Sequence, residues 1–214
     1  MTSDFSGQSG LRLHLGCGTD LIEGFVNCDI QDIEGVDEVM DCGNLLRFGN
    51  NSVKSIFGHS FFEHLYLYQQ VPFLKGCKRI LDDSGVLVLL GIPDFEKICR
   101  CYLSGVPAQP VFGKHFDLYG AYRLTHGDFE DGEKASIPQM HKTIFDKEGL
   151  GVLFPFCGFK NTRIFNYCSP GEDQKIGIGV IATNGAILTR NEMNITLSEF
   201  RHYFDDLGDV IESL

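Results

Sequence analysis

The sequence contains no hydrophobic run long enough to cross a membrane and no recognisable export signal. Its most apolar stretch, residues 86–92, is much shorter than the roughly 20 residues that a membrane-spanning helix needs. The first ten residues are polar and contain glycine and serine, and they lack the basic and apolar regions of a signal peptide. We therefore expect a cytoplasmic protein that has no membrane partner.

Basic residues are scarce as well. The chain has 18 lysines and arginines against 29 aspartates and glutamates, which gives a formal net charge of -11. Such a chain repels a phosphate backbone unless its cations are concentrated in one place. The densest basic stretch, residues 75–79, holds only three cations and lies in a predicted helix. The charge balance therefore predicts no nucleic-acid partner.

The eight cysteines include no CxxC pair, and the closest spacing is that of Cys99 and Cys101. Several cysteines stand inside apolar segments, namely Cys17, Cys28, Cys77 and Cys157. This placement predicts buried thiols rather than a disulfide framework. Reduced thiols agree with the expected cytoplasmic location, where structural disulfides are rare.

The first half of the chain alternates short apolar runs with helical segments. The runs are rich in aliphatic and β-branched residues with only weak polar alternation, which is typical of strands buried on both faces. Leu74, Cys77 and Leu81 recur at helical spacing, and the turn residues 82–85 end that predicted helix. Strands that alternate with helices predict an α/β fold with a mostly parallel sheet. The predicted strands are residues 11–15, 24–29, 36–41, 53–58 and 86–90.

The second half begins with a predicted helix at residues 95–103. Residues 104–142 then lose any clear period and contain many glycines, prolines and aromatic residues. A long irregular insertion in a compact domain is often a lid or a binding loop. Regular pattern returns with a helix at residues 143–157, which Pro155 should kink or shorten. Strands at residues 159–167 and 175–183 and a last helix at residues 198–207 complete the prediction.

A glycine turn, Gly16-Cys17-Gly18, follows the first predicted strand directly. Glycine permits a sharp turn and lets a nucleotide-like ligand approach the main chain at the carboxyl end of that strand. A dinucleotide fingerprint would have a third glycine where Leu21 stands and an acid about 20 residues further on. Here Asp29 comes only eleven residues after Gly18. The spacing therefore disfavours an NAD-linked oxidoreductase, which remains the weakest alternative.

Four segments in order resemble the motifs of class I S-adenosylmethionine-dependent methyltransferases, in particular a compact bacterial type with a very short first crossover. They are LHLGCG at 13–18, FVNCDI at 25–30, VMD at 39–41 and SFFEHL at 60–65. The resemblance extends over about residues 11–183. It implies one domain over residues 1–214 with a Rossmann-like sheet, mostly parallel with an antiparallel late strand, and an insertion at 104–142 after the fifth strand.

The sequence departs from this family in two places. A Lys-Pro-Gly-Gly-like turn of the family is replaced by Asp-Asp-Ser-Gly at residues 82–85. The family's first helix is nearly absent between Thr19 and Gly24.

The resemblance implies S-adenosyl-L-methionine as cofactor and S-adenosyl-L-homocysteine as product. The glycine turn would hold the methionine portion, and the two oxygens of the Asp29 carboxylate would accept hydrogen bonds from the ribose hydroxyls. Asp41 would face the adenine, although a polar residue in that place is often only a cap. The implied cofactor-binding residues are Leu15, Gly16, Cys17, Gly18, Asp29, Ile30, Asp41, Cys42, His59 and Ser60.

Methyl transfer from a sulfonium needs an aligned acceptor and often a group that removes a proton. The candidate catalytic residues are Glu63 and His64, for which a structural role is the alternative, and His126 and His141 from the insertion. Two H-x-D pairs, at 115–117 and 126–128, could together with His141 instead supply a metal site. We assign no metal ligands from the sequence.

Aromatic residues of the insertion either form an apolar wall of an acceptor pocket or pack the insertion onto the domain. They are Phe112, Phe116, Tyr119 and Tyr122. The predicted function is transfer of a methyl group to oxygen or nitrogen of a small-molecule or glycan-like acceptor. The alternative from another class is a non-catalytic S-adenosylmethionine-binding partner that regulates another enzyme. The oligomeric state stays undecided between a monomer and a homodimer.

Overall fold

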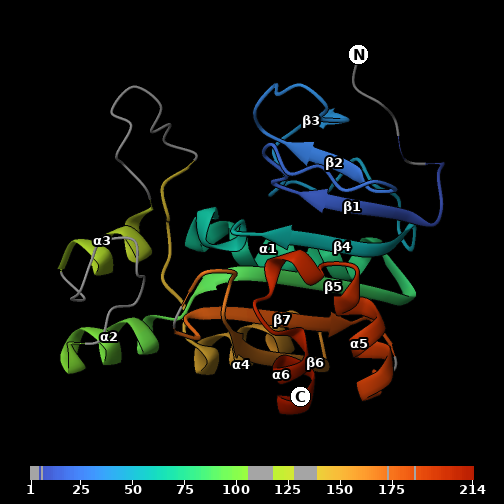
Figure 1. Ribbon diagram of the computed structural model, residues 1–214. Helices are drawn as coiled ribbons and strands as arrows, with labels where there is room; N and C mark the ends of the chain where they lie inside the picture. Colours follow the sequence, from blue (N-terminus) through green and yellow to red (C-terminus); the bar gives the residue numbers. More distant parts are fainter. Residues whose placement is uncertain (1–4, 6, 106–117, 128–138, 173, 186) are drawn as a thin grey trace.

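The computed structural model describes residues 5, 7–105, 118–127, 139–172, 174–185 and 187–214. Its centre is one seven-stranded sheet with the order β3-β2-β1-β4-β5-β7-β6 (Figure 1). The pairs from β3 to β5 are parallel, and β7 runs antiparallel to both β5 and β6. The strands are β1 (Leu11–Leu15), β2 (Val26–Asp29), β3 (Glu38–Val39), β4 (Val53–His59), β5 (Leu81–Pro93), β6 (Asn161–Tyr167) and β7 (Gly177–Thr183). This arrangement confirms the predicted α/β class and the antiparallel late strand.

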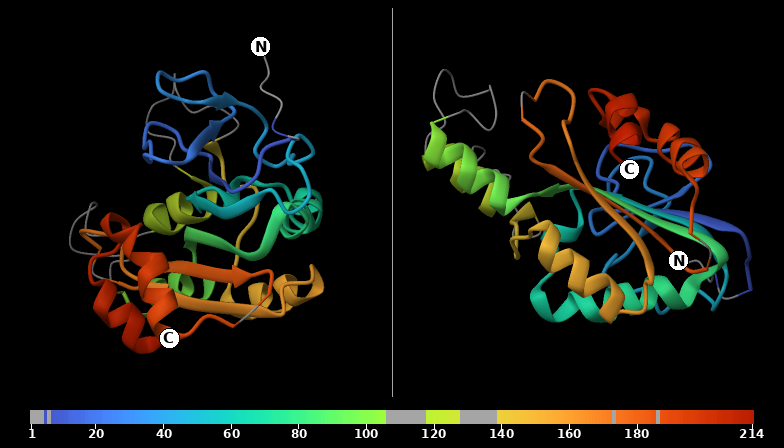
Figure 2. Two further views of the ribbon diagram at one scale, coloured as in Figure 1. Left: turned by 90° about the vertical axis from the view of Figure 1, so that its right-hand side faces the viewer. Right: turned by 90° about the horizontal axis from the view of Figure 1, so that it is seen from below.

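Helices cover both faces of the sheet. α1 and α4 lie on one face, and α5 and α6 lie on the other (Figure 2). α2 and α3 pack against each other beyond the carboxyl end of β5 (Figure 1). No described helix is both long and apolar enough to span a membrane. The helices are α1 (Leu67–Ile80), α2 (Phe95–Ser104), α3 (Leu118–His126), α4 (Lys147–Phe156), α5 (Arg190–Ser198) and α6 (Leu207–Ser213), with single 3₁₀ turns at Phe62–His64 and Arg201–Tyr203.

Two apolar clusters hold these layers together. Between the sheet and the α1/α4 layer, Phe73 and Phe154 are almost completely buried. On the other face, the rings of Phe57 and Phe200 stack with centroids 3.9 Å apart. A stacked pair contributes about 0.5–1.5 kcal/mol beyond the burial of its area. The second cluster matters for the site, because Phe57 stands in β4 two residues before His59.

Several predictions for the secondary structure were wrong in detail. The turn expected at residues 82–85 lies inside β5, where a register shift between β4 and β5 accommodates it. The insertion is not irregular throughout, because α3 packs Ala121 and Leu124 against the buried Ile98 of α2. The expected last helix at 198–207 is instead the end of α5, a 3₁₀ turn and the start of α6.

Local capping explains where the late helices begin. Thr189 and Glu192 form a reciprocal capping box that starts α5 well before the expected position. The Asp206 carboxylate accepts a hydrogen bond from the Asp209 N–H and starts α6 separately. Asp146 caps α4 in the same way, so that helix begins at Lys147 rather than at residue 143.

Candidate functional site

The carboxyl ends of β1, β2 and β4 open onto a cavity of about 310 Å³, called here the first cavity. Seven of the ten predicted cofactor-binding residues line it: Gly16, Gly18, Asp29, Ile30, Asp41, Cys42 and Ser60. Leu15 and Cys17 are buried and do not line it. The eight other lining residues are Gly43, Phe61, His64, Leu65, Tyr66, Gln69, Gln139 and Lys142. The sequence motifs therefore converge on one cavity, although they are spread over four separate segments of the chain.

The glycine turn has the backbone that its sequence predicts. Gly16 and Gly18 have positive φ angles of 68° and 52°, a region that favours glycine. A Cβ on Gly16 would lie 2.7 Å from a ring carbon of Phe61. The N–H groups of Gly16 and Cys17 both donate to the carbonyl of Cys28, at 2.9 and 3.1 Å. The turn thus presents a close backbone surface, while these N–H groups tie it to β2.

Asp29 ends β2 at the edge of the first cavity and is 6% exposed. One carboxylate oxygen accepts the Gly18 N–H and the other accepts the Gln31 N–H, each at 2.8 Å. Because a carboxylate oxygen has two lone pairs, each oxygen keeps one acceptor site for a ligand hydroxyl. Asp41 is exposed, and its carboxylate accepts the Gly43 N–H at 2.9 Å in a local turn.

A second cavity, also of about 310 Å³, lies beside the first, at the carboxyl ends of β4 and β5. Ser60 lines both cavities. His59, which the resemblance assigned to the cofactor, faces this second cavity instead. The remaining lining residues are Glu63, Gly91, Pro93, Arg123, Leu124, Gly127, His141, Ser169, Glu172, Ile176 and Gly177. The two cavities therefore adjoin at Ser60.

The sequence reasoning overlooked several residues of the second cavity. Gly91 interrupts the apolar run of β5, and a glycine inside a strand often marks a close approach of another backbone. The sequence therefore contains a signal for the position of Gly91 at the site. Arg123, Ser169 and Glu172 come from segments far apart in the chain, and no local pattern connects them.

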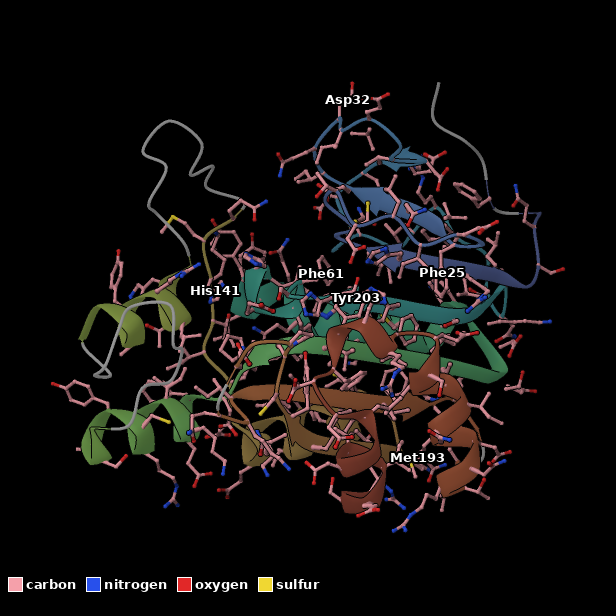
Figure 3. All side chains as sticks on the ribbon, in the orientation of Figure 1. Phe25, Asp32, Phe61, His141, Met193 and Tyr203 are labelled. Atoms are coloured by element: carbon pink, nitrogen blue, oxygen red, sulfur yellow. The ribbon has the colours of Figure 1, made fainter. Side chains whose placement is uncertain are left out.

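Three of the four predicted catalytic residues come together in the wall between the cavities. One ligand atom from each of Glu63, His64 and His141 lies within 4.8 Å of the others. Glu63 and His141 line the second cavity, whereas His64 lines the first. Figure 3 shows His141 toward the carboxyl ends of β1 and β4, on the same side as Phe61. The Lys142 N–H donates to the carbonyl of Glu63 at 2.8 Å and fastens this segment to the 3₁₀ turn.

Glu63 is the most unusual of these groups. It is 1% exposed, and its Oε2 has no hydrogen-bond partner among the described residues. Burial raises the pKa of its carboxyl to about 8. An isolated buried carboxylate is costly, so such a group is either protonated or compensated by a cation.

Both histidines of the wall are oriented by backbone carbonyls. His64 Nδ1 donates to Met140 O at 3.1 Å, and His141 Nδ1 donates to Leu124 O at 3.0 Å. A carbonyl only accepts, so the neutral rings carry their proton on Nδ1 and the lone pair on Nε2. Burial, followed by the neighbouring charge of His64, lowers the pKa of His141 to about 4. His141 is therefore neutral at physiological pH.

The fourth predicted residue, His126, lies apart from this cluster. It is exposed at the end of α3, bonds Thr125 Oγ1 through Nδ1 at 2.8 Å, and stacks on Tyr122 with centroids 4.5 Å apart. Both residues line a surface hollow between α2 and α3 rather than either cavity. The predicted partners His115, Asp117 and Asp128, with Phe112, Phe116 and the Tyr119 side chain, lie outside the described residues.

The fold is shared with solved structures of S-adenosylmethionine-dependent methyltransferases. One from Archaeoglobus fulgidus has a TM-score of 0.54 at 15% identity, covering 84% of this chain and 88% of that chain. One from Methanosarcina mazei has a TM-score of 0.53 at 15% identity, covering 86% and 96%. A possible exported protein from Bordetella parapertussis has a TM-score of 0.50 at 10% identity, covering 86% and 64%. The chain thus has a methyltransferase-like fold.

Sequence comparisons add nothing to this structural likeness. No protein-family model matches the chain, and no curated protein matches it in sequence. Identities of 10–15% establish the fold and leave the activity to be argued from the site.

His59 gives the protein a predictable response to acid. Burial lowers its pKa from 6.5 to about 4, and its ring stacks on Tyr203 with centroids 4.3 Å apart. Below pH 6.5 the His59 ring binds a proton in the unfolded chain, whereas in the folded protein it stays neutral down to about pH 4. The contribution of neutral His59 to the free energy of unfolding is therefore lost as the pH falls from 6.5 to 4. In His59→Phe, which keeps the stacked ring, we expect that loss to be smaller by on the order of 2–3 kcal/mol.

Urea unfolding at pH 7 and pH 4.5 measures this effect as a difference between the two proteins. Burial also lowers the pKa of His14 and His141. Those groups are present in both proteins, so the difference isolates His59. Equal pH dependence of wild type and His59→Phe would contradict the prediction.

Proposed function

We propose that this chain is an S-adenosylmethionine-dependent methyltransferase that methylates an oxygen or nitrogen of a small-molecule acceptor. One observation carries the proposal: two cavities meet at Ser60, at the carboxyl edge of a methyltransferase-like sheet. Ligands of open α/β sheets bind at that edge, in a crevice beyond the strand ends. A transferase that brings two small molecules together needs two adjoining hollows.

The first cavity supports a nucleoside-containing cofactor. Asp29 offers acceptor sites for the ribose hydroxyls, and the glycine turn lets the ligand lie close to the backbone. Leu65 and Tyr66 provide apolar and aromatic surface in the same cavity. Such surface suits the adenine, because aromatic side chains stack favourably on flat rings. S-adenosylmethionine, when bound here, supplies the reactive sulfonium methyl.

The second cavity supports a small polar acceptor. Arg123, Ser169 and Glu172 offer a cation, a hydroxyl and a carboxylate that can orient polar groups. S-adenosylmethionine would supply its methyl group to the acceptor atom and leave as S-adenosylhomocysteine, and the acceptor would lose a proton. The neutral His141 can take that proton directly. The clustering of Glu63, His64 and His141 also supports cation binding, which would activate the acceptor without a free base.

Calorimetric titration with S-adenosylmethionine, S-adenosylhomocysteine and NADH tests the cofactor. We expect micromolar binding of the first two and none of NADH. Asp29→Ala should weaken S-adenosylhomocysteine binding by about 10–100-fold, because it loses charge-assisted hydrogen bonds to the ribose. Asp82→Ala, a change in the exposed turn of β5, is the matched control and should bind as wild type.

The outcomes separate the alternatives. Binding of NADH alone would revive the oxidoreductase, and binding of none would remove the cofactor proposal. An unchanged dissociation constant in Asp29→Ala would remove Asp29 from the site. Binding of the cofactor without turnover across an acceptor screen would favour the non-catalytic regulatory partner.

A further inference from the structure

The wall between the two cavities holds a set of donor atoms that suits a metal ion. It consists of two imidazoles and one carboxylate, and one donor atom of each lies within 4.8 Å of the others. Two histidines and one acid are the donor set of many mononuclear transition-metal sites. Atoms bound to a metal at about 2.0–2.2 Å lie about 3–3.5 Å apart, so the side chains must close by on the order of 1 Å.

The two histidines are prepared for this role. Each donates its Nδ1–H to a backbone carbonyl, His64 to Met140 and His141 to Leu124. A histidine that binds a metal through Nε2 commonly has this second bond, which fixes the ring and its tautomer. The ring planes stand at 83° with centroids 4.9 Å apart, so the imidazoles do not stack on each other.

Glu63 supplies an independent reason to expect a cation. Its side chain is almost completely buried, and Oε2 is without a hydrogen-bond partner in the part of the chain that the structure describes. A buried oxygen of this kind loses its solvation and gains nothing in return. A metal ion bound by the same carboxylate would restore that lost interaction.

We propose that Glu63, His64 and His141 bind a divalent transition-metal ion at the junction of the two cavities. Imidazole donors favour zinc, iron, cobalt or nickel over magnesium and calcium, which prefer oxygen ligands. Three protein ligands leave further coordination positions open. Because Glu63 and His141 line the second cavity and His64 lines the first, the ion would lie where the two ligands meet.

The role of the ion rests on the proposed function. An acceptor hydroxyl or carboxylate that occupies an open position would be held beside the cofactor methyl. The ion would lower the pKa of a bound hydroxyl, so that the nucleophile forms near neutral pH. The site therefore predicts an acceptor with an oxygen that can bind a metal, such as a catechol, a hydroxamate or a hydroxy acid.

Cobalt(II) is the probe, because its visible absorption reports its ligands directly. The protein is stripped with a chelator and titrated with Co²⁺ in the absence of cofactor and acceptor. We expect one ion per chain with imidazole and oxygen ligands, and no thiolate charge-transfer band. Glu63→Gln and His141→Ala should each weaken Co²⁺ binding by at least about 100-fold, since each removes one of three protein ligands.

His202→Ala is the matched control, because His202 is an exposed histidine whose nearest carboxylate is that of Asp20 at 3.7 Å. It should bind Co²⁺ as wild type does. Glu63→Gln preserves the shape of the side chain and removes the buried acid, so it keeps the test valid if His141→Ala unfolds. Circular dichroism checks the fold of each variant.

Three results would overturn the metal site: no stoichiometric binding by wild type, full binding by folded Glu63→Gln, or thiolate bands in the spectrum. Titration of the same proteins with S-adenosylhomocysteine distinguishes this failure from failure of the proposed function. Loss of the metal site with intact S-adenosylhomocysteine binding leaves the cofactor proposal standing. Metal binding without S-adenosylhomocysteine binding leaves the metal site and removes its proposed role.

Discussion

Phe200→Ala should lower the free energy of unfolding by about 3–5 kcal/mol, the usual cost of removing a buried phenylalanine. The ring is 0% exposed and stacks on Phe57 at 3.9 Å and 6° between planes. It also meets Phe25 edge-on, with centroids 6.0 Å apart. Alanine would leave a cavity at the centre of one of the two apolar clusters, which the surrounding side chains can fill only partly.

Urea unfolding measures this loss, and Ile195→Ala is the control. Ile195 stands on the neighbouring α5 but is 61% exposed, so its truncation should change stability by less than about 0.5 kcal/mol. A loss below about 1 kcal/mol in Phe200→Ala would show that the cluster does not hold α5 and α6 on the sheet. The variant should also disturb the second cavity, because Phe57 and His59 both contact Tyr203.

Gly91→Ala should destabilise the protein by about 2–4 kcal/mol and impair binding in both cavities. Gly91 has a φ of 79°, and a Cβ there would lie 2.5 Å from Ser60 Oγ and 2.7 Å from Ser60 N. Ser60 itself has a φ of 46° and is the residue that the two cavities share. The backbone therefore has little freedom to move away from the added methyl group.

Gly171→Ala separates strain from steric clash. Gly171 has a similar φ of 83°, but a Cβ there would meet nothing within 4 Å. We expect that variant to lose only about 1 kcal/mol, the cost of the backbone conformation alone. Unfolding by urea and titration with S-adenosylhomocysteine measure both effects. Equal losses in the two variants would show that contact with Ser60 does not constrain the site.

Several elements were predictable because their causes are local. The continuous apolar run at residues 86–90 of β5 indicated burial on both faces of the sheet, which is typical of a parallel sheet. The glycines of the turn after β1 predicted a sharp backbone turn, and Gly16 and Gly18 have positive φ angles there. The last helix was wrong for an equally physical reason. One surface helix was expected at residues 198–207, but Phe200, Tyr203 and Phe204 are all buried in the second apolar cluster, on and around a 3₁₀ turn between α5 and α6.

The candidate site also has one part that local sequence predicts and another part that depends on tertiary packing. Segments carrying Gly16, Asp29 and Ser60 end neighbouring strands, so the topology of a parallel sheet is enough to bring them to one edge. Their order along the chain determined the fold class and the place of the first cavity. This part depended on backbone periodicity and turn chemistry, which are properties of short stretches of sequence.

Only the tertiary structure decided that Glu63, His64 and His141 share a wall while His126 stays outside it. The Lys142 N–H bond to Glu63 O and the His141 bond to Leu124 O fasten the end of the insertion against two other elements. Such long-range contacts leave no periodic trace in the sequence, because each depends on where separate elements pack. The separation of His59 from the first cavity has the same origin, because the backbone turns at Ser60, which has a positive φ.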